Sequence, residues 1–141
     1  MTGADLLRVV AMEREIFPDP WPLSSFEELL LSDDWSALVA EDESQIIGYT
    51  CFMTVSGEAH LANLAVDADH RRKSVAKQLV ERILKDIKAR QCTMILLEVR
   101  PSNVGAIAFY TKYGFVHLYR RPNYYRRPIE DALVMVRHLD L

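Results

Sequence analysis

Apolar positions change their spacing several times along the chain, and each spacing predicts an element. Residues Ala4–Ile16 carry leucine and valine three or four positions apart, as an amphipathic helix does. Three prolines then enforce an extended segment around Trp21. Ser24, with Glu27 three residues later, has the capping-box pattern that opens a short helix ending at Leu31. The chain is therefore predicted to begin with two helices.

Runs rich in β-branched and aromatic residues follow. Ser36–Ala40, Gln45–Val55 and Glu58–Val66 are separated by short polar turns, so they predict an antiparallel meander. From Ser74 to Arg90 one apolar face returns with the 3.6-residue period, which predicts a long helix. Residues Thr93–Val99 are almost all apolar, which is typical of a strand that is buried on both faces.

The last third of the chain predicts one more helix and two closing strands. The helix runs from Val104 to Tyr113 and stops at Gly114, because glycine suits a left-handed C-cap. The strands are Phe115–Arg120 and Ala132–Val136, joined by a loop over residues 121–131. The order α-α-β-β-β-α-β-α-β-β predicts an α/β protein with a mixed sheet.

Composition narrows the class of protein. The 141 residues include 17 basic and 20 acidic side chains, which gives a formal net charge of −3 and a pI of about 5.8. We expect one domain over residues 1–141, and the charge argues against general nucleic-acid binding, which needs a domain pI above ~9. A membrane span of ~18 apolar residues and a signal-peptide pattern are both missing, so we expect a cytoplasmic protein.

Cysteines and histidines predict no special chemistry. Cys51 and Cys92 are too few for a disulfide scaffold and are expected to be small apolar core residues. The four histidines share no spacing that is typical of metal ligands. We therefore expect no metal.

Three basic residues precede the long helix. Arg71, Arg72 and Lys73 lie at its N-terminus, where cations disfavour the helix but unpaired amide donors favour an anion. A bound pyrophosphate would explain this cluster. From the charges alone, a solvated turn that is neutralised by Asp67 and Asp69 explains it equally well.

Several motifs make the chain resemble the Gcn5-related N-acetyltransferase (GNAT) superfamily. Residues 71–76, Arg-Arg-Lys-Ser-Val-Ala, resemble its [QR]-x-x-G-x-[GA] loop, and residues 64–67 resemble the strand end before that loop. Residues 97–115 resemble the LEVRxSNxxAIxLYxKxGF run of the RimI-type branch, the ribosomal-protein-alanine N-acetyltransferases. Residues 17–21, Phe-Pro-Asp-Pro-Trp, and the tail over 123–132 resemble the same branch.

The resemblance implies a GNAT-type fold, with a mixed, largely antiparallel central sheet and helices on both faces. It implies acetyl-coenzyme A as co-substrate and a protein N-terminus as acceptor, namely that of small-subunit ribosomal protein eighteen. We expect no direct nucleic-acid or membrane partner, and a monomer or weak dimer. The residues implied for coenzyme A binding are Leu64, Ala65, Val66, Arg71, Arg72, Lys73, Ser74, Val75, Ala76, Lys77 and Asn103.

Ser74 stands where the family has glycine. If the backbone there is helical, serine is tolerated, and its hydroxyl caps the helix or donates to a phosphate. The alternative for this loop is a damaged cofactor site. Ser74 also motivates a separate alternative for the whole chain, a coenzyme-A-binding module without catalysis. Asn103, in turn, is explained either by a cofactor contact or by an N-cap.

Glu98 and Tyr110 are the candidate catalytic residues. Glu98 lies in an otherwise apolar strand, where a carboxylate is costly unless it is paired or functional. From the residues alone, the other interpretation of Glu98 is an ion pair with Arg100 or a carboxylate on an exposed strand end. For Tyr110 the other interpretation is packing in the core. The resemblance implies that Glu98 accepts the proton of the acceptor amine and that Tyr110 donates one to the sulfur of coenzyme A.

Aromatic residues are expected to shape the acceptor site. Trp21, Tyr124 and Tyr125 are assigned to loops beside an acceptor groove, with core packing the alternative for Trp21. A protein α-amine, with a pKa of ~7.7–8.0, is partly neutral at pH 7, whereas a lysine amine at ~10.4 is almost fully charged. A modest base therefore suffices for an N-terminus. Small-molecule amines and lysine side chains are the alternative acceptors, because the shared motifs do not separate them.

Overall fold

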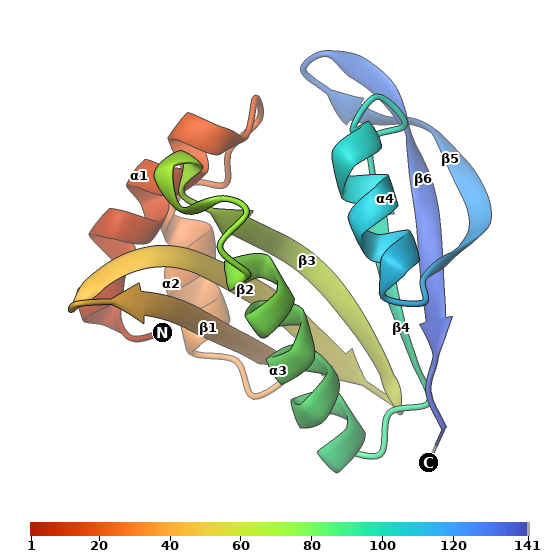
Figure 1. The fold of residues 1–141 in the computed structure, drawn as a ribbon, viewed down its shortest axis with the longest axis horizontal. Coiled ribbons are helices and arrows are strands. Elements are labelled where there is room, and N and C mark those ends of the chain that lie inside the picture. Colours follow the sequence, from red (N-terminus) through yellow and green to blue (C-terminus); the bar gives the residue numbers. More distant parts are fainter. Residues whose placement is uncertain (141) are drawn as a thin grey trace.

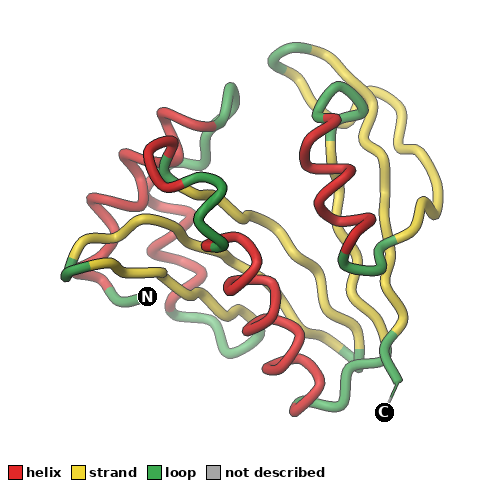
Figure 2. The backbone as a smooth tube through the Cα atoms, viewed as in Figure 1, coloured by secondary structure: helices red, strands yellow, loops and turns green. Residues whose placement is uncertain are grey.

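The computed structural model describes residues 1–140 and places one six-stranded sheet between two sets of helices (Figure 1). Figure 2 shows the helices and strands separately by colour. The elements are η1 (Gly3–Asp5), α1 (Leu6–Ile16), α2 (Leu23–Leu30), β1 (Trp35–Asp42), β2 (Gln45–Val55), β3 (Glu58–Val66), η2 (Ala68–His70), α3 (Val75–Ala89), β4 (Met94–Val99), α4 (Val104–Lys112), β5 (Val116–Arg126) and β6 (Ile129–His138).

The sheet consists of two antiparallel halves that meet in one parallel pair. Its strand order is β1-β2-β3-β4-β6-β5, and only β3 and β4 run parallel. Their pairing covers Glu58–Leu61 against Met94–Leu97, although β3 continues to Val66 and β4 to Val99. Beyond the paired residues the two strands diverge (Figures 1 and 2). The predicted mixed, largely antiparallel sheet with helices on both faces is confirmed.

Apolar side chains fix the helices on their faces. One core cluster joins α1 and α2 to β2, with Met12 and Phe26 packed near Tyr49. The cluster on the opposite face joins α3 and α4 to the centre of the sheet, with Ile83 and Leu97 among its buried members. In Figure 1, α1 and α2 lie over the half formed by β1–β3, and α4 lies over the half formed by β4–β6.

Two glycines allow the packing of α3 on the sheet and the sharp turn after α4. A Cβ on Gly48 would lie 3.0 Å from the carbonyl oxygen of Ala65 and 3.1 Å from Cγ1 of Val75, so only glycine lets α3 approach β2 this closely. Gly114 has a φ of +86° after the end of α4, which confirms the predicted left-handed C-cap.

The start of α2 and the burial of β4 differ from the prediction. The helix begins at Leu23 with Pro22 as N-cap and without a side-chain capping bond, so the capping box at Ser24 is wrong. The reason is that the extended proline segment runs up to Pro22 and helical backbone begins directly after it. Strand β4 alternates between buried and half-buried residues, because only its α4 side has a helix over it.

The largest error concerns residues 121–131, which form a hairpin rather than a loop. Strand β5 runs to Arg126 and β6 begins at Ile129, with Arg121 opposite Ala132 and Tyr125 opposite Glu130. Because β5 is an edge strand, it tolerates a proline and many charged residues, and these hide its periodicity. Strands β2 and β3 match their predicted bounds to the residue, and the other boundaries shift by one or two residues.

Among residues 1–140, the helices are all too short or too polar to cross a membrane.

Candidate active site

The Glu98 carboxylate lies just beyond the last paired residues of β3 and β4, on the face of the sheet away from α4. Its Oε2 atom lies 2.5 Å from Nε2 of His60 on β3, and its Oε1 atom lies 3.5 Å from Nη1 of Arg121 on β5. The side chain is 14% exposed. Glu98 thus stays accessible between two groups that can carry positive charge.

Arg100 is not the partner of Glu98, and that alternative is wrong. Its Nη1 atom donates to Glu130 Oε1 at 3.3 Å, and its guanidinium also donates to the carbonyl oxygens of Arg127 and Pro128. The backbone N–H of Ser102 donates to Glu130 Oε2 at 2.8 Å. Chiefly this bond lowers the pKa of Glu130, and Arg100 adds to the effect. Together these contacts tie the tip of the β5–β6 hairpin to the β4–α4 connection.

Tyr124 and Tyr125 lie beside Glu98 on β5, so their assignment to a loop is wrong. Their rings meet edge to face with centroids 5.0 Å apart. The guanidinium of Arg121 lies 4.5 Å from the Tyr124 centroid, and that of Arg100 lies 4.2 Å from the Tyr125 centroid. Burial raises the pKa of both phenols, that of Tyr125 to about 12, and the charge of Glu98 adds to the shift. Both side chains are therefore neutral hydrogen-bonding groups at pH 7.

Tyr110 lies on α4 with its ring packed between Phe109 and Phe115, at centroid distances of 5.3 and 5.5 Å. Core packing of the ring is thus confirmed, but its hydroxyl donates no hydrogen bond to any group in residues 1–140. Burial raises the pKa of the phenol, with a further contribution from Tyr125. Tyr125 therefore interacts electrostatically with both candidate catalytic residues, Glu98 and Tyr110.

A second carboxylate, Glu13 on α1, was missed by sequence reasoning. It is 1% exposed and accepts three hydrogen bonds: from the Tyr49 hydroxyl, from Asn63 Nδ2 at 2.9 Å, and from the Trp21 backbone N–H at 2.9 Å. Burial raises its pKa, while these hydrogen bonds oppose the shift. An acidic residue on the apolar face of the first predicted helix, next to Met12, was the available signal.

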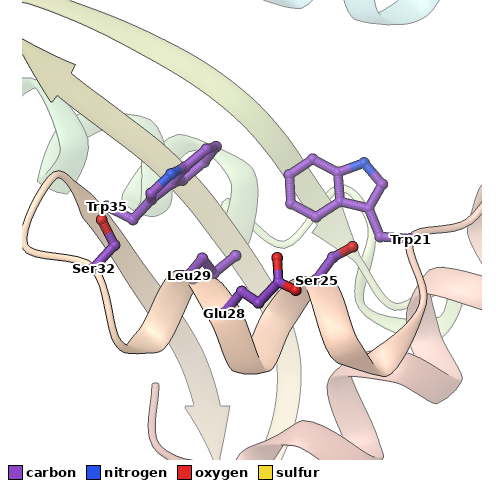
Figure 3. A pocket seen from close by; sticks show the side chains of 6 residues that line it. All are labelled: Trp21, Ser25, Glu28, Leu29, Ser32 and Trp35. Atoms are coloured by element: carbon purple, nitrogen blue, oxygen red, sulfur yellow. The ribbon is translucent and has the colours of Figure 1, made fainter.

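The backbone of Trp21 is held by this bond to Glu13, and its ring packs against other aromatic rings, as its core-packing alternative predicts. Its place beside an acceptor groove stays a prediction. Its ring lies 5.6 Å from that of Phe26 and 6.2 Å from that of Trp35. A pocket of about 410 Å³ opens beside the two tryptophans (Figure 3).

The loop before α3 has the backbone that glycine usually supplies. Ser74 has φ +64° and ψ 17°, in the left-handed region, and its side chain makes no capping bond. The expectation of a helical, capping Ser74 is therefore wrong. A left-handed serine costs about 1–2 kcal/mol, yet the loop retains the conformation. The N–H groups of Val75, Ala76 and Lys77 begin the helix and have no acceptor within it.

The basic residues of this loop are not neutralised by its aspartates. Asp67 Oδ2 lies 3.5 Å from Arg8 Nη2 and 3.2 Å from His70 Nδ1. Within residues 1–140, Arg71, Arg72 and Lys73 have no carboxylate within 4.0 Å, so the alternative of a neutralised turn is wrong. Three exposed cations and three amide donors meet at one helix end, which fits a polyanionic group such as a pyrophosphate.

The C-terminal end of β3 lies between the loop before α3 and Glu98. Residues Leu64 and Val66 pair with β2, whereas β4 pairs with β3 only as far as Leu61. Among the described residues, the β4-facing edge of Leu64, Ala65 and Val66 thus has no strand partner. Asn103, on the other side of the divergence, caps α4 by accepting from the Ala106 N–H at 3.2 Å, as its N-cap interpretation predicts.

A sheet that divides after a short parallel pair, with three cations at a helix end on one side of the division, is the arrangement expected of coenzyme-A-dependent acetyltransferases. The acetyltransferase (GNAT) family model matches residues 6–115. The chain belongs to this family and is an N-acetyltransferase. The resemblance that the motifs indicated is thereby confirmed.

Relatives point to one branch of the family. The [ribosomal protein bS18]-alanine N-acetyltransferase of Salmonella typhimurium is 37% identical over 100 residues, which cover 70% of this chain and 66% of that protein. The Escherichia coli K12 protein of that name is 29% identical over 133 residues, which cover 93% of this chain and 89% of its own.

Solved structures agree with this placement. The crystal structure of the E. coli ribosomal-protein-S18-alanine N-acetyltransferase matches with a TM-score of 0.92 at 27% identity, covering 100% of this chain and 92% of that one. Ard1 from Thermoplasma volcanium matches with a TM-score of 0.92 at 26% identity, covering 100% and 95%.

Proposed function

We propose that this enzyme transfers the acetyl group of acetyl-coenzyme A to the N-terminal amine of a protein, and that its acceptor is the N-terminal alanine of ribosomal protein bS18. The names of relatives that align with 93% of the chain support this acceptor. The observation that carries the chemistry is the Glu98 carboxylate, held by His60 and Arg121 where β3 and β4 separate. A ribosomal acceptor implies a cytoplasmic enzyme.

Acetyl-coenzyme A supplies the acetyl group as a thioester, and the loop before α3 is proposed to bind its pyrophosphate. The N–H groups of Val75, Ala76 and Lys77 act as donors, and the three preceding cations balance the charge. Ser74 supports this assignment because it adopts the left-handed backbone conformation that glycine usually supplies at this position of the loop. Leu64, Ala65, Val66 and Asn103 are proposed to hold the rest of the cofactor along the divergence.

Glu98 is proposed to accept the proton of the acceptor amine. The amine nitrogen forms a bond to the acetyl carbon as the bond from that carbon to sulfur breaks. The proton that leaves the nitrogen passes to the carboxylate, directly or through one water. His60 and Arg121 hold both carboxylate oxygens, which fixes the direction in which the base faces.

Tyr110 is proposed to return a proton to the departing sulfur. Its pKa is raised by burial, so the phenol keeps its proton at neutral pH, and packing leaves the hydroxyl free to donate. The reaction then balances: the amine loses one proton to Glu98, and the thiolate gains one from Tyr110. Transfer is direct, from one bound substrate to the other.

The aromatic residues around Glu98 are proposed to receive the first residues of the acceptor. Tyr124 and Tyr125 stand on one side of the carboxylate and Trp21 on the α2 side, each fixed by contacts with its neighbours. An α-amine is partly neutral at pH 7, so a carboxylate is a sufficient base for it, whereas a lysine amine needs far stronger deprotonation.

The test is an acetyl-transfer assay with three peptides. One begins Ala-Arg-Tyr, one begins Met-Leu, and the third has an acetylated N-terminus and one free lysine. We expect rapid turnover of the alanine peptide. Turnover of the capped lysine peptide alone contradicts the proposal. Failure of coenzyme A to bind in calorimetry contradicts the cofactor assignment separately.

A further inference from the structure

The pocket beside α2 contains two indole rings and one carboxylate. It is lined by Trp21, Ser25, Glu28, Leu29, Ser32 and Trp35. The two indoles meet edge to face, with centroids 6.2 Å apart and planes at 85°. Figure 3 shows both rings above α2 and the Glu28 side chain rising from the helix toward the space between them. Aromatic faces and an acidic group therefore border the same hollow.

This combination suits a cation, and residues 1–140 place none there. The faces of indole rings attract ammonium and guanidinium groups, and a nearby carboxylate adds to that attraction. Within residues 1–140, the observed contacts between a cation and a ring involve Phe52, Tyr124 and Tyr125, and neither tryptophan has one. In the same part of the chain Glu28 has no ion-pair partner.

The distribution of charge along the chain favours a cationic ligand in this pocket. Residues 15–70 contain 12 acidic side chains and no lysine or arginine, so all 17 basic residues lie outside that segment. The segment includes the whole pocket together with α2 and β1–β3. Four of its acidic residues are exposed on or directly after α2, namely Glu27, Glu28, Asp33 and Asp34. Acidic groups beside a pocket attract positively charged polypeptides and raise their rate of association.

The pocket also lies on the path of an extended peptide that starts at Glu98. Trp35 pairs with Met53, and Met53 pairs with His60, so these three residues form one row on one face of the sheet. Strand spacing places β1 about 10 Å from β3, where His60 holds Glu98. An extended chain advances about 3.3 Å per residue, so a residue about three to five places after the reacting amine reaches the tryptophans.

We infer that the pocket between Trp21 and Trp35 binds an arginine or lysine side chain of the acceptor polypeptide, at about its third to fifth residue. This inference rests on the proposed function, because it takes the acceptor to be a polypeptide with its amine at Glu98. Glu13 prepares the site by holding the backbone of Trp21. Glu98 would face the amine of the first residue, and the pocket would bind the side chain of a later one. Together they would select basic N-terminal segments.

The first experiment compares peptides that differ in one charge. Each begins with alanine and carries either arginine or its neutral isostere citrulline at one position from two to six, with no lysine. A cation over an indole changes affinity by about two- to thirtyfold, so we expect KM to be about tenfold lower for arginine at one of positions three to five. Equal KM values at every position overturn the inference.

A second readout does not depend on turnover. The chain has two tryptophans, and both line the pocket, so intrinsic tryptophan fluorescence reports on it directly. Titration with the arginine peptide is expected to change the emission at concentrations about tenfold lower than the citrulline peptide requires. If this difference appears without any acetylation, the pocket stands and the proposed function fails. If peptides are acetylated without the difference, the function stands and the pocket fails.

Matched variants localise the effect. Glu28→Gln removes the carboxylate at the pocket, and Glu27→Gln removes its exposed neighbour on the same helix, which does not line the pocket. We expect Glu28→Gln to reduce the preference for arginine over citrulline to about threefold or less, and Glu27→Gln to leave it unchanged. Glu27→Gln is also expected to leave turnover of the citrulline peptide unchanged. An equal loss in both variants shows a diffuse acidic surface instead of this pocket and overturns the inference.

Discussion

Glu13 and Glu98 lie on the same face of the sheet but have opposite surroundings. Glu13 is almost fully buried, and its oxygens accept from a backbone N–H, a phenol and an amide, none of which carries charge. Glu98 is partly exposed and faces an imidazole and a guanidinium. The first carboxylate accepts from three fixed neutral donors, whereas the second keeps solvent access and lies between an imidazole and a guanidinium.

The difference separates a structural role from a chemical one. A buried carboxylate that is held by neutral donors stabilises the positions of those donors, here the Trp21 backbone and Asn63. A carboxylate with access to a substrate and with cationic partners can take up and release a proton during each turnover. Glutamate therefore holds Trp21 and Asn63 in one place and is proposed to act as the base in the other.

The largest expected effect comes from Glu98→Gln. Loss of a general base typically lowers rates by about 10²–10⁴-fold, so we expect kcat/KM to fall at least a hundredfold at neutral pH. The melting temperature should fall only slightly, because the amide keeps one oxygen for one of the two donors and the other donor, at this partly exposed site, can bind water instead. Glu58→Gln, an exposed change at the first residue of β3, is the control and should retain activity. If kcat/KM falls no further in Glu98→Gln than in Glu58→Gln, the role of Glu98 as general base is contradicted.

Tyr110→Phe tests the second proton transfer. Removal of the hydroxyl keeps the ring between Phe109 and Phe115, so we expect kcat to fall about tenfold or more while KM for the peptide hardly changes. Tyr113→Phe, at the C-cap of the same helix, is the matched control, since its ring also packs on Phe109. Steady-state kinetics of the two variants separate them. Equal kcat values would show that the Tyr110 hydroxyl serves packing alone.

Glu13→Gln should act on binding and stability instead of the chemical step. The amide supplies one acceptor where three donors converge, so a buried donor loses its partner, at a cost of about 1–3 kcal/mol in the free energy of unfolding. Because Trp21 is then held less firmly, KM for the acceptor peptide should rise while kcat stays near the wild-type value. Urea unfolding and kinetics measure both effects. A fall in kcat as large as that of Glu98→Gln would erase the distinction between the two carboxylates.

The smallest effect concerns acid stability of the hairpin. The pKa of Glu130 is lowered in the folded protein, so its ionised form stabilises the fold above its unfolded pKa of about 4.3, and this contribution is lost as pH falls through the folded value. Glu130→Gln should therefore flatten the loss of melting temperature with falling pH below about 5. Calorimetric melting curves at several pH values check this. Parallel curves for variant and wild type would contradict the expected linkage.

The sequence predicted most of the fold where hydrophobic period and turn residues agree. Strands β2 and β3 were located to the residue, because the Ser56-Gly57 turn separates two strongly patterned runs. The β5–β6 hairpin was shortened because an edge strand does not need apolar residues on both faces. The left-handed Ser74 could not be predicted, since only the surrounding loop sets the sign of its φ.

For the site, the sequence found Glu98 but not its partners. An acidic residue in an apolar strand is visible in the sequence, whereas His60 reaches it only through the pairing of β3 with β4. Arg100 was the nearest cation along the chain, but the hairpin brings Glu130 to it from 30 residues away. Glu13 was missed because its three donors come from separate elements, and no local pattern records such a convergence.

The most direct measurement places two amines in one molecule. A peptide with a free N-terminal alanine and one lysine is incubated with acetyl-coenzyme A and either wild-type enzyme or Glu98→Gln, and tandem mass spectrometry locates the acetyl group. The account predicts acetylation of the α-amine by the wild type, and a strong loss of that product with the variant. Acetylation of the lysine, or an undiminished rate with Glu98→Gln, would contradict it.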